Sequence, residues 1–360
     1  MNPYPGPRSF QRGERLYGRE RETGELLDLL IAERIVLLYS PSGAGKSSLL
    51  HAALIPELER EGFRVLPPLR AGLPVDASMN GANRYTLSLL QTLEERRPAD
   101  QQRTLGELAG LSLAEYLAQD KPSADNRSWH GDVLILDQFE EVLTVDPGGQ
   151  AGKRAFFEQL GEALRSRNRW ALFAMREEYV AALDPYLRPI PTRFDKGRRY
   201  RLDLLGPQAA RQAVQQPARA AGIDFSDAAA AKLVDDLRTV RVQALLPTPS
   251  EGEGVITALG NVVEPVQLQV VCRRLWDGLQ PDDRVIDLAD VQGVGDVDSN
   301  IRRLGRFWRA LLSAVSKTED DLGRARLQRM VSHESVGASA PPRARESSSR
   351  SARTARSSPA

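Results

Sequence analysis

Residues 40–47 read SPSGAGKS and match the pattern G-x-x-x-x-G-K-[ST] at every fixed position but the first, where serine replaces glycine. Gly43 and Gly45 can adopt backbone angles that turn successive N–H groups towards one anion. Lys46 adds an ammonium group suited to the β- and γ-phosphates of a nucleotide, and Ser47 adds a hydroxyl suited to Mg²⁺. The pattern therefore predicts a phosphate-binding loop with seven residues at the nucleotide: Ser42, Gly43, Ala44, Gly45, Lys46, Ser47 and Ser48.

The sequence on either side of this loop bears on whether it binds a nucleotide or only caps a helix. An apolar run at residues 35–39 is typical of a strand buried on both faces, and a helical pattern begins within residues 45–48. A strand before and a helix after are the context that a phosphate-binding loop requires, and the positive end of the helix favours an anion. We therefore expect a nucleotide site, although Ser40 departs from the consensus glycine.

A second set of chemical groups, DQFEE, directly follows the apolar residues 133–136. Because parallel strands end at the same edge of a sheet, Asp137 should lie beside the loop and hold Mg²⁺ through water or together with Ser47. A carboxylate near the γ-phosphate can orient and deprotonate the attacking water. Glu140 and Glu141 both qualify, and their spacing does not choose between them. A helix N-cap for the aspartate and a solvated first turn for the glutamates are the alternative interpretations.

Arg176 follows another apolar run, residues 170–175, and is the third candidate for a catalytic role. At that edge of the sheet a guanidinium group could sense the γ-phosphate or stabilise charge that develops during transfer. A surface ion pair with a neighbouring glutamate is the alternative.

The elements that must position these groups alternate between short apolar runs and amphipathic stretches. We expect helices at about residues 20–33, 45–60, 85–96, 105–118 and 151–166, and strands at 35–39, 63–66, 133–136 and 170–175. Such alternation predicts a parallel sheet covered by helices on both faces. Residues 1–10 are expected to run extended over a surface.

The strand signal fades after about residue 205. Residues 206–240, 264–279 and 300–331 are helical by pattern, and residues 241–260, rich in Pro, Gly and Thr, predict a loop or an insertion. From residue 332 the composition is mostly Ser, Arg, Ala and Pro, which cannot form a core.

Composition excludes several classes of protein. The 360 residues carry 49 Lys and Arg against 48 Asp and Glu, so no global positive field would attract nucleic acid. The last thirty residues hold five Arg and two Glu, which leaves the first 330 with a net charge of −2 against the chain's total of +1. One cysteine and three widely separated histidines disfavour disulfides and zinc sites. No apolar run approaches the ~20 residues of a membrane span, and no signal peptide is evident. We therefore expect a cytoplasmic protein.

Taken in order, several short segments resemble the STAND NTPases (signal transduction ATPases with numerous domains), in particular the novel STAND subgroup that is often fused to WD-repeat propellers. The resemblance covers about residues 2–315. The segments are NPYPG at 2–6, LYGRERE at 16–22, PSGAGKSSL at 41–49, VLILDQFEE at 133–141, QPARAAG at 216–222 and EPVQLQ at 264–269.

The resemblance implies a fold and a division of the chain. The fold is a three-layer α/β P-loop NTPase domain of the AAA+ type with a parallel central sheet, at residues 1–205. An α-helical subdomain at 206–296 and a partial winged-helix region at 297–331 follow, and then a disordered tail at 332–360.

The resemblance also implies roles for single residues. Tyr17, Gly18 and Arg19 would line the adenine and ribose side of the site. Arg176 would be the sensor arginine after the fourth core strand. Pro265 falls where STAND proteins carry a proline that contacts the nucleotide, and a proline in the first turn of a helix explains it equally well.

The function implied is a switch in signal transduction or bacterial defence that binds ATP or ADP with Mg²⁺ and hydrolyses ATP slowly. The ATP state would form a homo-oligomer or activate an unknown effector or sensor protein. Two alternatives stay open: a DNA-associated ATPase of the origin-recognition type, which the charge balance disfavours, and a truncated nucleotide-binding scaffold without activity.

Overall fold

A computed structural model describes residues 2–73, 82–120, 129–146, 148–243, 255–280 and 282–293. These residues belong to one compact unit, Met1–Phe307. The expected winged-helix region, 297–331, and the tail, 332–360, lie outside the described residues. Within the described ranges, no helix is both long and apolar enough to span a bilayer.

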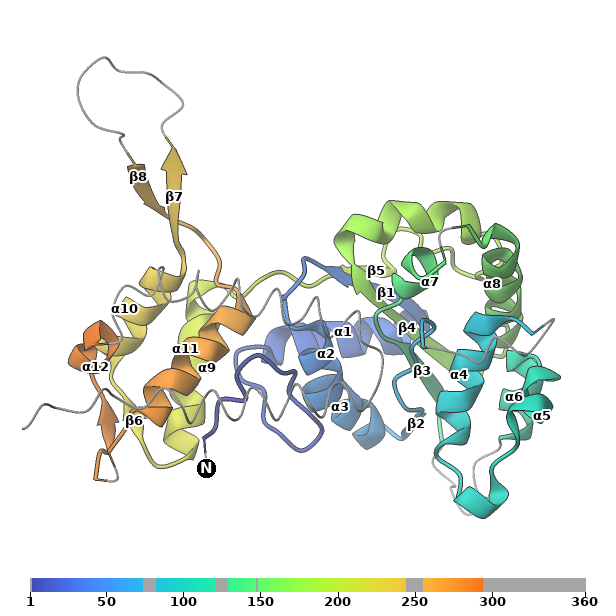
Figure 1. Cartoon of the computed structure of the whole chain (residues 1–360), viewed down its shortest axis with the longest axis horizontal. Coiled ribbons are helices and arrows are strands. Elements are labelled where there is room, and N and C mark those ends of the chain that lie inside the picture. The colour runs from blue at the N-terminus through green and yellow to red at the C-terminus, as the bar shows by residue number, and fades with distance from the viewer. Residues whose placement is uncertain are drawn as a thin grey trace, which may run out of the picture. The chain divides into compact units, whose positions relative to one another are not determined.

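A five-stranded parallel sheet forms the centre of the α/β part (Figure 1). Its order is β2-β3-β4-β1-β5, with all four pairs of neighbours parallel. The strands are β1 (Ile35–Ser40), β2 (Phe63–Val65), β3 (Gly131–Leu136), β4 (Arg169–Arg176) and β5 (Arg199–Arg201). The predicted α/β class and parallel central sheet are confirmed; the short edge strand β5 was not predicted.

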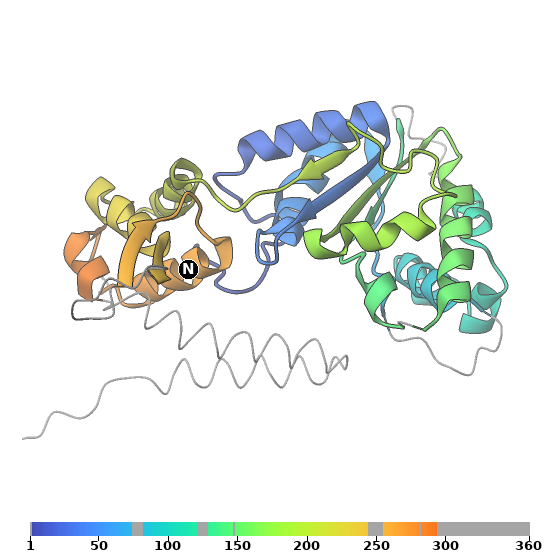
Figure 2. The same ribbon diagram turned by 90° about the horizontal axis from the view of Figure 1, so that it is seen from above.

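Alternate residues of the three central strands enter two separate cores, which is why their sequences are apolar throughout. In β1, for example, Leu37 packs on one side of the sheet, and Val36 and Leu38 on the other. The first core is covered by α4 (Arg84–Glu94), α5 (Leu105–Ala109), α6 (Leu113–Gln119) and α8 (Gln150–Leu164), and the second by α1 (Glu20–Glu33) and α3 (Ile55–Arg60). Figure 2 shows α1 and α8 on opposite sides of the sheet.

The helix after the phosphate-binding loop has three parts: α2 (Lys46–Ser48), a π-helical segment (Leu49–Leu54) and α3. The expected helix at 105–118 is divided into α5 and α6. Each of these begins with a capping box, Thr104 with Glu107 and Ser112 with Glu115, so the second cap starts a new helix. Two further short helical pieces, α7 (Glu141–Thr144) and a 3₁₀ segment (Glu177–Tyr186), follow β3 and β4.

A third core lies in the helical part, between α9 (Pro207–Ala220), α10 (Asp227–Leu237), α11 (Pro265–Asp277) and α12 (Leu288–Gly293). Two short strands, β6 (Asp224–Phe225) and β9 (Val285–Ile286), pair in parallel beside it. Where we expected a loop or an insertion at 241–260, β7 (Thr239–Gln243) and β8 (Val255–Leu259) pair as an antiparallel hairpin, and these two strands were not predicted.

We expected the N-terminal segment to run extended over a surface, but it also contributes a side chain to this third core. Tyr4 is 1% exposed, its hydroxyl donates to the carbonyl oxygen of Val214, and its ring meets Trp276 edge to face. Further along, the Phe10 N–H donates to Oγ of Ser48 at 3.1 Å. One short segment therefore contacts both the helical part and the helix that follows the phosphate-binding loop.

Candidate functional site

The loop at residues 40–47 joins β1 to α2, with Gly43 at φ +80° and Gly45 at φ +92°. Both glycines lie in the left-handed region, which a side chain would make unfavourable. Lys46 donates from Nζ to Oγ of Ser40 at 2.7 Å, and that hydroxyl donates in turn to the Pro41 carbonyl at 2.8 Å. The serine that replaces the consensus glycine is thus fully buried and engaged with the loop lysine.

Ser47 and Asp137 meet at the carboxyl edge of the sheet. The Ser47 hydroxyl donates to Oδ2 of Asp137 at 2.8 Å, and the N–H of Gln138 donates to the other carboxylate oxygen at 2.9 Å. Strand β4 lies between β1, which leads into the loop, and β3, which leads into Asp137. It brings Arg176 to the same edge, where Arg176 is the register partner of Ser40. The edge therefore gathers the groups expected from three separate segments.

These oxygens suit Mg²⁺, which prefers hard oxygen ligands and commonly takes one or two protein ligands together with water and phosphate oxygens. No cluster of three or more His, Cys, Asp or Glu able to hold a metal occurs among the described residues. The donor set of one hydroxyl and one carboxylate, Ser47 and Asp137, fits an ion that is shared with a phosphate ligand.

Glu140 and Glu141 lie in different environments. Oε1 of Glu140 is 3.3 Å from Nε of Arg176, and Oε2 accepts from the Arg176 N–H at 3.3 Å. Glu141 instead pairs with Arg70 and accepts from the Gly72 N–H at 3.2 Å. The structure brings Glu140 together with Arg176 and leaves Glu141 to fix the segment that follows β2.

Burial and charge act against each other at Lys46 and Glu140. Burial lowers the pKa of the Lys46 ammonium group, while the carboxylates of Glu140 and Asp137 oppose that shift. Burial raises the pKa of Glu140, and Lys46 and Arg176 oppose it. Buried ionisable groups whose pKa values are shifted, and whose charges influence each other, are typical of a functional site.

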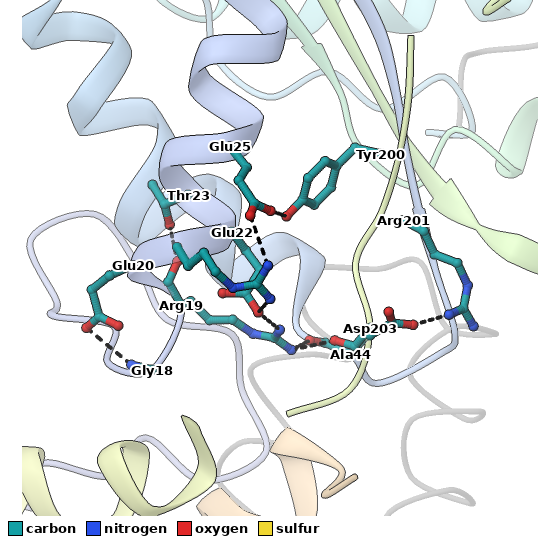
Figure 3. Close-up of polar contacts among 11 residues, drawn as sticks. Gly18, Arg19, Glu20, Glu22, Thr23, Glu25, Ala44, Tyr200, Arg201 and Asp203 are labelled. Carbon is teal, nitrogen blue, oxygen red and sulfur yellow. Dashed lines mark hydrogen bonds and ion pairs between the residues drawn. The ribbon is translucent and has the colours of Figure 1, made fainter. Parts of the chain in front are cut away.

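Arg19 connects the start of α1 to the loop (Figure 3). Its guanidinium donates to the carbonyl oxygens of Ala44 at 3.1 Å and Asp203 at 2.7 Å, and to Glu22 at 3.0 Å. The side chain is 5% exposed, and burial lowers its pKa. Both terminal nitrogens of the guanidinium are therefore bonded to protein oxygens, and Arg19 holds the loop in place.

A cavity of about 60 Å³ lies beside the loop. Such a volume holds roughly four to six water molecules. Its walls include the predicted residues Tyr17, Arg19, Ala44, Gly45, Ser48 and Pro265, together with Gly6, Arg8, Phe10, Leu16, Leu205, Ala213, Pro217, Val266 and Gln269. Gly18 does not border it; a Cβ there would lie 2.4 Å from the carbonyl oxygen of Ala209 in α9, so glycine allows close packing.

Two residues of the site were missed in the sequence. Glu264 precedes α11, and its Oε1 lies 2.8 Å from where a Cβ on Gly43 would be. Gln269 borders the cavity from the second turn of the same helix. Both belong to the EPVQLQ segment, which offered only a resemblance, because nothing in the segment shows which helix face meets the loop.

The five-stranded parallel sheet, the loop after β1 and the aspartate after β3 define a P-loop NTPase. The family model described as "Novel STAND NTPase 1" matches residues 3–358, and the chain belongs to this family. The match extends beyond residue 315, where the resemblance in the sequence ended. A search of curated proteins found no significant relative.

Comparison with solved structures supports the same fold. The Walker-type ATPase paby2304 of Pyrococcus abyssi is 15% identical, with a TM-score of 0.52 over 86% of this chain and 79% of its own. The RuvB Holliday junction branch migration motor of Thermotoga maritima is 13% identical over 77% of this chain and 69% of its own. Its TM-score of 0.39 is too low to support an inference.

Proposed function

We propose that this chain is a switch that binds ATP and ADP with Mg²⁺ and hydrolyses ATP slowly. The observation that carries the proposal is the meeting of Lys46, Ser47, Asp137 and Glu140 at one edge of the sheet, as the contacts above describe. These are the groups needed to bind phosphates, to hold Mg²⁺ and to accept a proton from water.

In the proposed reaction, loop N–H groups and Lys46 hold the β- and γ-phosphates. Mg²⁺, held by Ser47 and Asp137, would supply positive charge that offsets the charge of the transferring group. Glu140 orients a water molecule and takes its proton as the water oxygen bonds to the γ-phosphorus and the bond to the bridging oxygen breaks. Arg176 stabilises the charge on the γ-phosphate oxygens.

The residues around the cavity support a division of the nucleotide site in two. The cavity meets Gly45 and Ser48 at the end of the loop. A nucleotide with its phosphates on the loop would then place its base in the cavity, against Tyr17 and Pro265. The guanidinium of Arg15 lies 4.9 Å from the centre of the Tyr17 ring, so this aromatic wall is itself supported.

The switch part of the proposal rests on α11. Glu264, just before this helix, lies against Gly43, and Pro265 borders the cavity. Because both lie at the start of α11 in the helical part, loss of a phosphate can change the position of this helix relative to the loop. A ligand shifts such an equilibrium only through contacts that differ between the two states.

The switch is tested by measuring molecular mass in solution with each nucleotide. The Glu140→Gln variant, which should bind ATP without hydrolysing it, is expected to form oligomers with ATP and Mg²⁺ and to stay monomeric with ADP. The same mass with both nucleotides would overturn the switch. Steady-state ATP hydrolysis by the unmodified chain separates an ATPase from an inactive scaffold. The effector, a role in bacterial defence and a cytoplasmic location belong to the same proposal.

A further inference from the structure

Gln269 in the cavity wall carries a buried polar atom that has no hydrogen-bond partner among the described residues. The residue lies in α11 and is 8% exposed, and the atom is its Oε1. A buried amide oxygen without a partner costs free energy, because folding has removed it from water without replacing the hydrogen bond. This oxygen is itself shielded from solvent, so the amide must rotate to present it to a ligand in the cavity, and its terminal torsion has the broad preference that allows this.

Most of the other polar side chains of the wall have partners, while the hydroxyl groups of Tyr17 and Ser48 donate no hydrogen bond to the described residues. Arg8 pairs with Glu14, Arg19 with the contacts described above, and Oγ of Ser48 accepts from the N–H of Phe10. Around them the wall is largely apolar or aromatic. Gln269 differs from these hydroxyl groups because its buried acceptor has no partner and its amide offers an acceptor and a donor in one plane.

We infer that Gln269 reads the base and selects adenine. A glutamine amide presents one acceptor and one donor in a plane, which complement the 6-amino group and N7 of adenine. Guanine presents two acceptors, O6 and N7, on that edge, so only the NH₂ of the amide could be satisfied there. The inference rests on the proposed nucleotide site and adds the residue that determines its base preference.

The test uses the full chain and calorimetric titration with ADP and with the diphosphate of purine riboside, which lacks the 6-amino group. The unmodified chain should bind ADP roughly 5- to 150-fold more tightly than this analogue. In Gln269→Leu, a substitution that preserves approximate size in a buried position, the ratio should fall towards one. Gln208→Leu is the matched control, since Gln208 is an exposed residue of α9 outside the cavity wall, and it should keep the full ratio.

Equal affinities of the unmodified chain for the two ligands would overturn the inference, and so would a preference for ADP that survives in Gln269→Leu. The first comparison changes only the ligand, so it holds even if the variant folds poorly. If neither ADP nor the analogue binds the unmodified chain, the proposed nucleotide site itself is wrong. If both bind with equal affinity, that site stands and only the role of Gln269 fails.

Discussion

The hydroxyl of Ser47 donates a hydrogen bond to Asp137 at 2.8 Å, although the two residues are 90 positions apart in the chain. The parallel sheet brings the two residues together. Strands β1 and β3 end at the same edge, with only β4 between them. If the loop and Asp137 only capped helices, Ser47 and Asp137 would not need to contact each other. It is the arrangement expected of two residues that share one hydrated Mg²⁺ ion.

Asp137→Asn should remove most of the dependence of nucleotide binding on Mg²⁺. The amide keeps the shape of the side chain but loses the negative charge that attracts the ion, and a loss of about 10–100-fold in metal affinity is expected. Calorimetric titration of ATP with Mg²⁺ and with a chelator measures the effect. Asp236→Asn, in an exposed pair on α10, is the control and should leave the dependence unchanged. An equal Mg²⁺ effect in Asp137→Asn would contradict the assignment.

Glu140→Gln and Glu141→Gln should separate catalysis from stability. Glu140 faces Arg176 and influences Lys46, so its loss should reduce the hydrolysis rate by about 10²–10⁴-fold while ATP still binds. Glu141 pairs with Arg70 and Gly72, so its variant should keep its hydrolysis rate and lose about 1 kcal/mol of unfolding free energy. Phosphate-release kinetics and urea unfolding measure the two effects. Loss of hydrolysis in Glu141→Gln, with hydrolysis kept in Glu140→Gln, would show that Glu141 is the catalytic residue.

The pH dependence of hydrolysis should show the raised pKa of Glu140. Only the deprotonated carboxyl group accepts a proton, so kcat should be lost as pH falls through this pKa, at a pH above the ordinary glutamate value of about 4.3. Arg176 opposes the shift, so Arg176→Ala should move this acidic limb to higher pH. A profile of kcat against pH for both proteins tests this, and an unmoved limb would exclude Glu140 as the titrating group.

Arg19→Lys should destabilise the chain, although it preserves the charge. A lysine ammonium group lacks the planar fork that reaches Ala44, Asp203 and Glu22 together, and buried carbonyl oxygens would lose their partner. We expect a loss of about 2 kcal/mol in unfolding free energy, together with weaker nucleotide binding. Arg165→Lys is the matched control, because that exposed side chain pairs with the exposed Glu162 at the surface. An equal loss of unfolding free energy in the two variants would contradict the role of Arg19 in holding the loop.

The sequence predicted the sheet well because burial on both faces leaves a clear apolar signature, as in Ile35–Ser40 and Gly131–Leu136. It could not choose between Glu140 and Glu141. Adjacent residues point about 100° apart around a helical turn, and the packing of Phe139, 1% exposed, decides which one faces the edge.

The EPVQLQ segment shows a second limit. Its helix was predicted, but the roles of Glu264 and Gln269 depend on the face that α11 turns to the loop. The hairpin of β7 and β8 was also missed, because the composition of residues 241–260 is that of a loop. In each case the missing information is a contact between segments distant in the chain.

The central claim, that this loop binds a nucleotide, is tested most directly by calorimetric titration of Mg²⁺–ATP into the unmodified chain, Lys46→Ala and Lys232→Ala. Lys232 lies on α10 in a surface pair with Asp236, so its variant controls for the loss of one positive charge. We predict saturable binding by the unmodified chain and by Lys232→Ala, and no measurable binding by Lys46→Ala. Unchanged affinity in a folded Lys46→Ala protein would contradict the account.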